Sequence, residues 1–184
     1  MEGDRIASLK KAMLLLASPT PIPSEHFARF QNREEVGIIT FSTAPAATVL
    51  FPMGSNSAQN AKTRAAITQF VNPLTAGGNT AIYSSIQQAL TELSQQRSQG
   101  KDKRYYTVVL MTDGINNRGL EFREFADWYR DQGDKVRGIP VFPILFGEGN
   151  ASELSSLADL TGGKLFDSRS SALAAVFKEI RGYQ

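Results

Sequence analysis

The sequence of 184 residues contains no cysteine and only one histidine. Without cysteine the chain cannot form a disulfide, a zinc–thiolate site or a thiol nucleophile, although this does not identify a redox compartment. The charge is nearly balanced, with 20 Lys and Arg against 18 Asp and Glu spread along the chain, so it does not indicate nucleic-acid binding. His26 has no second histidine and no Ser/Asp arrangement nearby, so we expect an ordinary surface or packing residue.

Long apolar runs are also lacking. The longest, residues 107–111 and 141–146, are much shorter than the roughly 20 residues that a membrane-spanning helix needs, so no span is predicted in this chain. A hydrophobic content of 41% is nevertheless sufficient for a hydrophobic core. We therefore expect one domain, residues 1–184.

Apolar periodicity predicts strands that alternate with helices along the chain. Residues 36–41 and 48–53 are predicted to form a hairpin, and Pro52 places its second strand at a sheet edge. The continuous apolar runs at 105–111 and 140–147 are typical of parallel strands that are buried on both faces. The expected fold is α/β and doubly wound, with a mostly parallel sheet, one antiparallel edge strand and helices on both faces. Helices are expected near residues 5–16, 61–71, 82–93, 122–129, 154–158 and 173–180.

Two polar residues are predicted at the carboxyl ends of the strands. Asp113 follows the buried strand in a TDG segment, and Thr80 precedes a helix in a GGNT segment. Since helix amino termini converge at this edge of a doubly wound sheet, we expect Thr80 and Asp113 to lie close together. A hydroxyl and a carboxylate are hard oxygen donors, which suit Mg²⁺, Mn²⁺ or Ca²⁺ rather than zinc or copper.

Each of these residues also has a plainer interpretation. Thr80 can be a helix N-cap, Asp113 with Gly114 can be a turn, and the glycines before Thr80 can serve only a tight backbone bend. Asn116 and Asn117 fit a polar turn, and as neighbours of Asp113 they are also placed to touch a partner. Asp113 is the hardest to dismiss, because it ends a strand whose interior is wholly apolar and loops at that position carry function.

The combination of segments resembles a von Willebrand factor type A domain, also called an integrin I-like domain, of bacterial type. The resemblance covers nearly the whole chain and rests on FS after VGIIT, GGNTAIYSSIQQAL, VVLMTDGINN, PVFPILFG and LADLTGGKLFDS. The family holds a divalent cation in a metal-ion-dependent adhesion site made of a DxSxS loop, a later Thr and a second Asp. By resemblance, Thr80 and Asp113 are the metal ligands, and the loops that meet a partner contain Gly78, Asn79, Gly114 and Asn116.

The resemblance also has a departure. Family members usually continue the DxSxS loop with a sequence like MxGxRI, and here MEGDRI is residues 1–6. We therefore expect an amino-terminal truncation that removes the first strand and the DxSxS loop, and weak or no Mg²⁺, Mn²⁺ or Ca²⁺ binding by this chain. Such a truncation would leave strand edges unpaired. We therefore expect either a poorly stable chain or one in which a rearranged sheet, a swapped segment or an oligomer covers those edges.

For function, the resemblance implies a protein-binding module. An acidic residue of a protein partner would complete the coordination of its bound cation. It also implies an extracytoplasmic part of a larger bacterial protein. One alternative is a Mg²⁺-dependent phosphoryl-transfer enzyme that uses Asp113, but the sequence has neither a P-loop nor a GxGxxG fingerprint. Another is a scaffold that needs no metal. We expect a binding module and no enzymatic activity.

Overall fold

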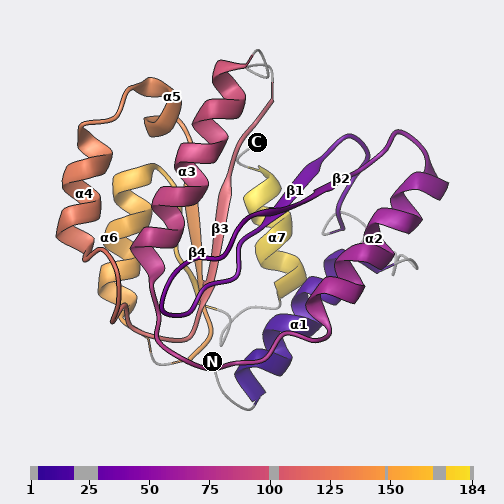
Figure 1. Ribbon diagram of the computed structural model, residues 1–184, viewed down its shortest axis with the longest axis horizontal. Coiled ribbons are helices and arrows are strands. Elements are labelled where there is room, and N and C mark those ends of the chain that lie inside the picture. Colours follow the sequence, from indigo (N-terminus) through magenta and orange to yellow (C-terminus); the bar gives the residue numbers. More distant parts are fainter. Residues whose placement is uncertain (1–3, 19–28, 100–103, 148, 168–172, 183–184) are drawn as a thin grey trace. The chain divides into compact units, whose positions relative to one another are not determined.

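The structure is a computed structural model that describes residues 4–18, 29–99, 104–147, 149–167 and 173–182 (Figure 1). His26 lies outside the described residues. The chain forms two compact units. The first contains residues 1–38, 47–77 and 171–183, and the second contains residues 39–46, 78–170 and 184.

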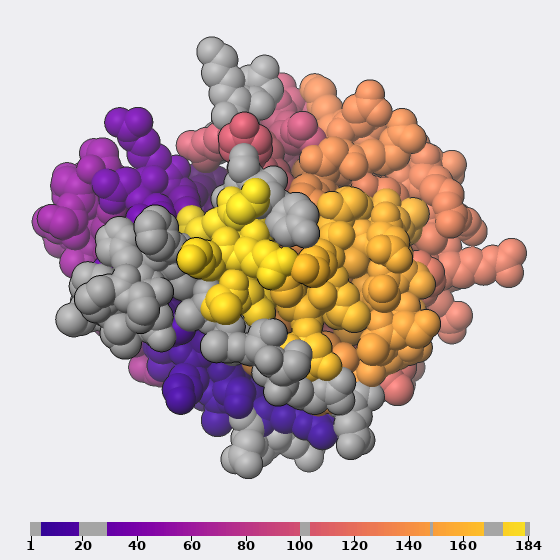
Figure 2. Space-filling view, turned by 180° about the vertical axis from the view of Figure 1, so that it is seen from behind, coloured from indigo at the N-terminus to yellow at the C-terminus, as the bar shows by residue number. Residues whose placement is uncertain are grey.

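Helices α1, α2 and α7 and strands β1 and β2 make up the first unit. The two strands pair antiparallel, with Val36 opposite Phe51, which confirms the predicted hairpin. Helix α1 packs against both α2 and α7. The outward side chains of α7 are the yellow atoms in Figure 2. The elements span Asp4–Leu16 (α1), Glu35–Ile38 (β1), Val49–Pro52 (β2), Ser57–Val71 (α2) and Leu173–Gly182 (α7).

Helix α2 begins earlier than the sequence predicts. It begins at Ser57 and not near Ala61, because the side chain of Asn56 caps it by accepting a hydrogen bond from the backbone N–H of Gln59 at 2.9 Å. Its buried apolar residues are Ile67 and Val71, which pack with Ala17 and Phe51, while Ala66 is exposed.

The second unit holds a parallel sheet in the order β3–β4–β5. The β3–β4 register runs from Val108 opposite Val141 to Thr112 opposite Leu145. The predicted α/β architecture with parallel strands is therefore confirmed. The elements span Ile82–Ser98 (α3), Val108–Thr112 (β3), Phe122–Arg130 (α4), Asp134–Arg137 (α5), Val141–Leu145 (β4), Ala151–Thr161 (α6) and Phe166–Asp167 (β5).

The antiparallel strands differ in one respect from the expected arrangement. Within the described residues, β1 and β2 pair only with each other, in a two-stranded sheet of their own. Strand β3 pairs on one side with β4, and no other described strand pairs with its opposite edge. Among the described residues, the antiparallel pair thus forms a two-stranded sheet of its own.

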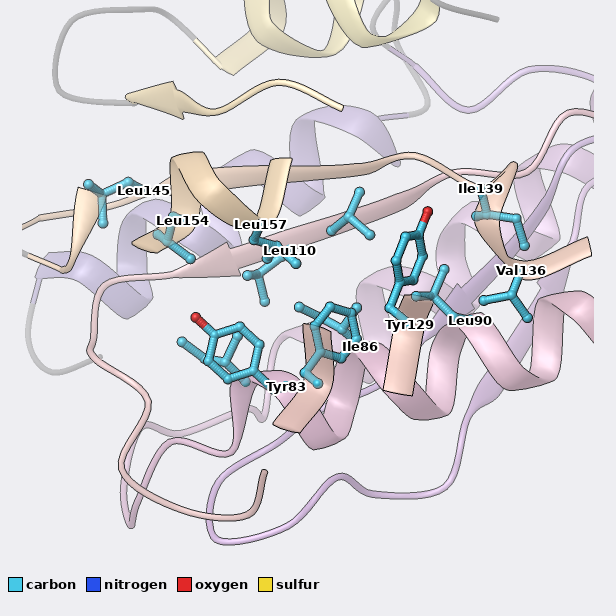
Figure 3. Packing of buried hydrophobic residues seen from close by; sticks show 13 residues of the cluster. Tyr83, Ile86, Leu90, Leu110, Tyr129, Val136, Ile139, Leu145, Leu154 and Leu157 are labelled. Carbon is cyan, nitrogen blue, oxygen red and sulfur yellow. The ribbon is translucent and has the colours of Figure 1, made fainter. Parts of the chain in front are cut away.

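Helices α3, α4 and α6 and the sheet enclose the core of the second unit (Figure 3). Strand β4 is buried along its whole length: Val141 and Leu145 join this core, and Phe142 points to the other face, where its ring lies 6.4 Å from that of Phe166. Trp128 packs on Phe125 at a ring distance of 5.7 Å. None of the described helices is both long and apolar enough to cross a membrane.

Candidate metal and partner site

Three loops of the second unit meet at the carboxyl end of β3. They contain residues 42–43, 78–81 and 113–117. The backbone N–H of Ala81 donates to the carbonyl of Ser42 at 2.9 Å, and the Asn79 amide donates to the Thr43 hydroxyl at 3.3 Å. These bonds fix the segment before α3 against the 42–43 loop.

Thr80 is held beside the turn that contains Asp113. The Thr80 N–H donates to Oδ1 of Asn117 at 2.8 Å, and the Asn117 N–H donates back to the Thr80 carbonyl at 3.0 Å. A Cβ built on Gly114 would stand 3.4 Å from Oγ1 of Thr80. The structure therefore brings the Thr80 hydroxyl next to Gly114, the residue that follows Asp113.

The side chain that caps α3 comes from Asn116 and not from Thr80. Helix α3 begins at Ile82, and its N–H donates to Oδ1 of Asn116 at 2.8 Å. The Asn116 amide nitrogen donates to the carbonyl of Leu120 at 2.9 Å, so both ends of this amide hold backbone groups in place. The N-cap interpretation of Thr80 is therefore wrong. The sequence did not reveal the role of Asn116, because its partners are set by the tertiary fold.

Asp113 lies at the carboxyl end of β3 with 8% of its surface exposed. The preceding Thr112 is buried, and its hydroxyl accepts a hydrogen bond from the N–H of Gly114 at 3.2 Å, which tightens the turn. Asp113 thus sits at the edge of the core.

Glycine is required at Gly78. Its φ of +80° lies in the left-handed region, and a Cβ there would stand 3.3 Å from Cβ of Ser42. Gly78 therefore lets the segment before α3 approach the 42–43 loop closely. This gives the residue a structural role next to the candidate site.

A buried tyrosine links the start of α3 to the start of α6. The Tyr83 hydroxyl donates to the carboxylate of Glu153, and its ring stacks on Phe125 at a centroid distance of 5.7 Å. Burial raises the pKa of Tyr83 well above its usual value, and the hydrogen bond and negative charge of Glu153 raise it further. Tyr83 therefore remains a neutral hydrogen-bond donor at physiological pH.

The donors at this site fit part of a metal site. The Asp113 carboxylate and Thr80 hydroxyl are hard oxygen groups of the kind that Mg²⁺, Mn²⁺ and Ca²⁺ prefer, but such ions take about six ligands. In the part of the chain that the structure describes, no three acidic or histidine side chains are grouped so as to hold a metal. The described residues therefore fit a partial coordination sphere.

Solved structures with a similar fold come from the mussel byssus. Proximal thread matrix protein 1, in its crystal form 2, has a TM-score of 0.53 and 17% identity over 95% of this chain. The same protein with a zinc-occupied MIDAS motif has a TM-score of 0.58 and 19% identity, again over 95% of this chain. Such identities show the fold alone. The chain covers 39% and 40% of those chains.

The search of curated proteins gave no match. Among protein families, the model of the von Willebrand factor type A domain matches residues 1–179. This match covers both compact units and includes the Thr80 and Asp113 loops. The chain belongs to the von Willebrand factor type A domain family.

Proposed function

We propose that this domain binds a protein partner through a divalent cation that Thr80 and Asp113 help to hold. Domains of this family are generally protein-interaction modules. The observation that carries the proposal is the pair of hydrogen bonds between Thr80 and Asn117, at 2.8 and 3.0 Å, which fixes Thr80 beside the Asp113–Gly114 turn. A ligand residue whose backbone is held in this way needs little reordering when a cation binds.

The cation in the proposal is Mg²⁺, with Mn²⁺ or Ca²⁺ as substitutes. The similar mussel structure with a zinc-occupied MIDAS motif supports a divalent ion in this fold. Thr80 would contribute its hydroxyl and Asp113 its carboxylate, and the remaining positions would go to water and to oxygens from outside the described residues. When bound, the cation would supply a positive site for a carboxylate oxygen of the partner.

The partner in the proposal presents an acidic residue next to an apolar one. Ile115 follows the Asp113–Gly114 turn and is 58% exposed, so it offers apolar contact area beside the cation position. Asn79, on the neighbouring loop, offers an amide. An acidic side chain for the cation and an apolar side chain for Ile115 would complement these two features.

The proposed role is binding and not catalysis. Phosphoryl transfer at Asp113 would need an acid or base beside it. In the adjoining loops, Thr80, Asn116 and Asn117 carry hydroxyl and amide groups, and the two amides are hydrogen-bonded to backbone. These groups suit a shaped binding surface.

Calorimetric titration with Mn²⁺ tests the metal site. The wild-type chain is expected to bind weakly, in the millimolar range, because two protein ligands are few for such an ion. Asp113→Ala and Thr80→Ala are expected to remove the binding, while Asp131→Ala, an exposed carboxylate in α4's C-cap, is the matched control and keeps it. Unchanged binding in both site variants would instead favour a scaffold that needs no metal at this site.

A further inference from the structure

Two charged residues lie on the loops that meet at the carboxyl end of β3. In the segments 42–43, 78–81 and 113–119 they are Asp113 and Arg118, and every other residue there is apolar or carries a hydroxyl or amide group. In the proposed function the carboxylate of Asp113 is a ligand of the cation. Arg118 is then the side chain of these loops whose charge the proposed site does not use.

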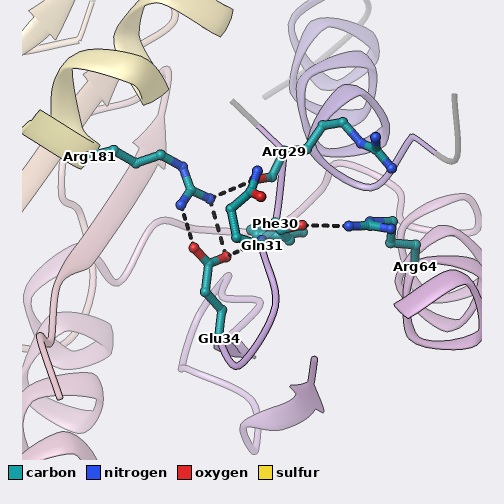
Figure 4. A network of polar contacts seen from close by, with 6 residues as sticks. All are labelled: Arg29, Phe30, Gln31, Glu34, Arg64 and Arg181. Carbon is teal, nitrogen blue, oxygen red and sulfur yellow. Dashed lines mark hydrogen bonds and ion pairs between the residues drawn. The ribbon is translucent and has the colours of Figure 1, made fainter. Parts of the chain in front are cut away.

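Arg118 differs from arginines that serve the fold. In the first unit, Arg181 contacts both carboxylate oxygens of Glu34 (Figure 4). On α4 of the second unit, Arg130 pairs with Asp127 at 3.0 Å. Arg118 is exposed and makes no hydrogen bond or ion pair with a residue that the structure describes. Its guanidinium group is therefore accessible to a partner.

The backbone on both sides of Arg118 is anchored to the start of α3. Before it, the N–H of Asn117 donates to the Thr80 carbonyl at 3.0 Å. After it, the N–H of Leu120 donates to Oγ of Ser84 at 3.0 Å. A turn that is already ordered loses little conformational entropy when a partner binds to it. The two bonds therefore hold the backbone of Arg118 in a fixed position.

This position is close to the proposed cation ligand. Arg118 directly follows Asn117, the residue that is bonded to Thr80, and Cα atoms of neighbouring residues are only about 3.8 Å apart. An extended partner segment advances by about 3.3 Å per residue. A segment that places one carboxylate on the cation can therefore place a second, a few residues away, on Arg118. The planar guanidinium group matches a carboxylate with two parallel hydrogen bonds.

We propose that Arg118 selects partners that carry a second acidic residue near the one that reaches the cation. This inference rests on the proposed function and specifies the partner further. The first carboxylate binds the cation, the second pairs with the guanidinium group of Arg118, and an apolar side chain contacts Ile115. The partner is thus a locally acidic protein segment, and the opposite charges also speed its association.

Selection from a random peptide library displayed on phage, in the presence of Mn²⁺, tests this specificity. Peptides selected by the wild-type chain are expected to carry two acidic residues at a fixed spacing. Arg118→Glu reverses the charge, so its selected peptides are expected to keep one acidic residue and to carry Lys or Arg in place of the other. A purely structural role of Arg118 would not produce this exchange.

The affinity of one selected peptide with two acidic residues, made synthetically, is then measured by fluorescence anisotropy. Arg118→Gln is expected to weaken binding about three- to tenfold and to make it less sensitive to NaCl, because one charge pair is lost. Arg130→Gln makes the same change of charge at an exposed side chain at the other end of α4, and it keeps the wild-type affinity. Urea unfolding of both variants verifies that the fold is intact.

The role of Arg118 is overturned if no peptide is enriched over a selection without the protein, or if the selected peptide binds Arg118→Gln as tightly as the wild-type chain. EDTA and Asp113→Ala test the cation separately. A peptide that needs Mn²⁺ and Asp113 but not Arg118 supports the proposed function and refutes this inference. A peptide that needs Arg118 but neither Mn²⁺ nor Asp113 supports the acidic contact and refutes the cation.

Discussion

Asn117 binds Thr80 twice: its side-chain oxygen accepts from the Thr80 N–H at 2.8 Å, and its own N–H donates to the Thr80 carbonyl at 3.0 Å. The second bond needs only the backbone, but the first depends on the asparagine side chain. The loop after β3 therefore fixes the position of the Thr80 backbone. This makes the geometry of the candidate metal ligand depend on a residue that would not itself touch the metal.

Asn117→Ala is expected to lower the free energy of unfolding by about 0.5–1 kcal/mol, since it removes one exposed hydrogen bond. It should also weaken Mn²⁺ binding, because Thr80 is then held less firmly. Urea unfolding and Mn²⁺ titration measure the two effects. Asn79→Ala removes a longer amide contact, of 3.3 Å to Thr43, and serves as the stability control. Mn²⁺ binding equal to that of the wild-type chain would show that Asn117 does not position Thr80.

Asn116→Ala removes the side chain that caps α3 through the N–H of Ile82. Loss of such a cap typically costs about 1 kcal/mol, and here a second bond, to the Leu120 carbonyl at 2.9 Å, is lost as well. We expect a decrease in the free energy of unfolding of about 1–2 kcal/mol in urea titrations. Thr80→Ala, which removes no cap, should have a smaller effect, and the reverse order would contradict the assignment of the cap.

Much of this fold follows from local sequence patterns. The hairpin, the two long parallel strands and the helices are predicted by apolar periodicity, because burial on one or both faces imposes that pattern directly. The proximity of Thr80 to the Asp113–Gly114 turn followed from topology alone, since helix starts and strand ends converge at one edge of a parallel sheet.

The features that the sequence did not reveal depend on contacts between distant residues. The capping role of Asn116 requires a partner 34 positions away, and no local rule connects the two. The strands β1 and β2 pair with each other in a sheet of their own. Such pairing depends on which strand edges meet, and the apolar pattern of a single strand does not specify its partner. The early start of α2 does follow from the local sequence, because Asn56 is an N-cap signal. Apolar periodicity alone places the start of this helix too late.

Gly119 requires glycine for two separate reasons. Its φ is +69°, and a Cβ there would collide with Oγ of Ser84, the hydroxyl that accepts from the N–H of Leu120 at 3.0 Å. Gly119→Ala is therefore expected to lower the free energy of unfolding by about 1–3 kcal/mol. Gly133→Ala is the matched control, because its φ is −75° and no atom lies near its Cβ position. If the two substitutions lowered the free energy of unfolding in urea equally, Gly119 would have no special requirement for glycine.

Tyr83 is expected to make stability fall at alkaline pH. Its pKa is raised in the folded state, so above about pH 10 the unfolded chain loses this proton first, and ionisation then favours unfolding. The slope from this one residue is at most about 1.4 kcal/mol per pH unit. Tyr129, whose pKa burial also raises, adds to the trend.

Replacing Tyr83 by Phe separates its contribution. At pH 7 the variant loses the hydrogen bond to Glu153, which should cost about 1–2 kcal/mol. Above pH 10 the difference from the wild-type protein should shrink, because the wild-type tyrosine no longer favours the folded state as strongly. Tyr105→Phe, at a tyrosine that is 78% exposed, is the control for the loss of a hydroxyl and should leave the stability at pH 7 unchanged. A constant difference between pH 7 and the alkaline range would show that Tyr83 titrates normally.

Strand β3 presents an edge that no described strand pairs with. Its bonds to the β4 side involve Val108, whose N–H donates to the Pro140 carbonyl at 3.0 Å, and Thr112, whose carbonyl accepts from the Phe146 N–H at 2.8 Å. Because successive residues of a strand direct their backbone groups to alternate sides, Val109 faces the other edge. An apolar strand with such an edge favours pairing between molecules.

We therefore expect the chain to self-associate with rising concentration, as measured by light scattering during size-exclusion chromatography. Tyr105→Lys adds a charge at an exposed position before β3, which should shift the chain towards the monomer without disturbing the core. Ala66→Lys adds the same charge at an exposed position of helix α2, which has no strand edge, and it should not alter the association. A wild-type chain that stays monomeric at all concentrations, with the stability of an ordinary domain in urea, would show that the edge of β3 is already covered.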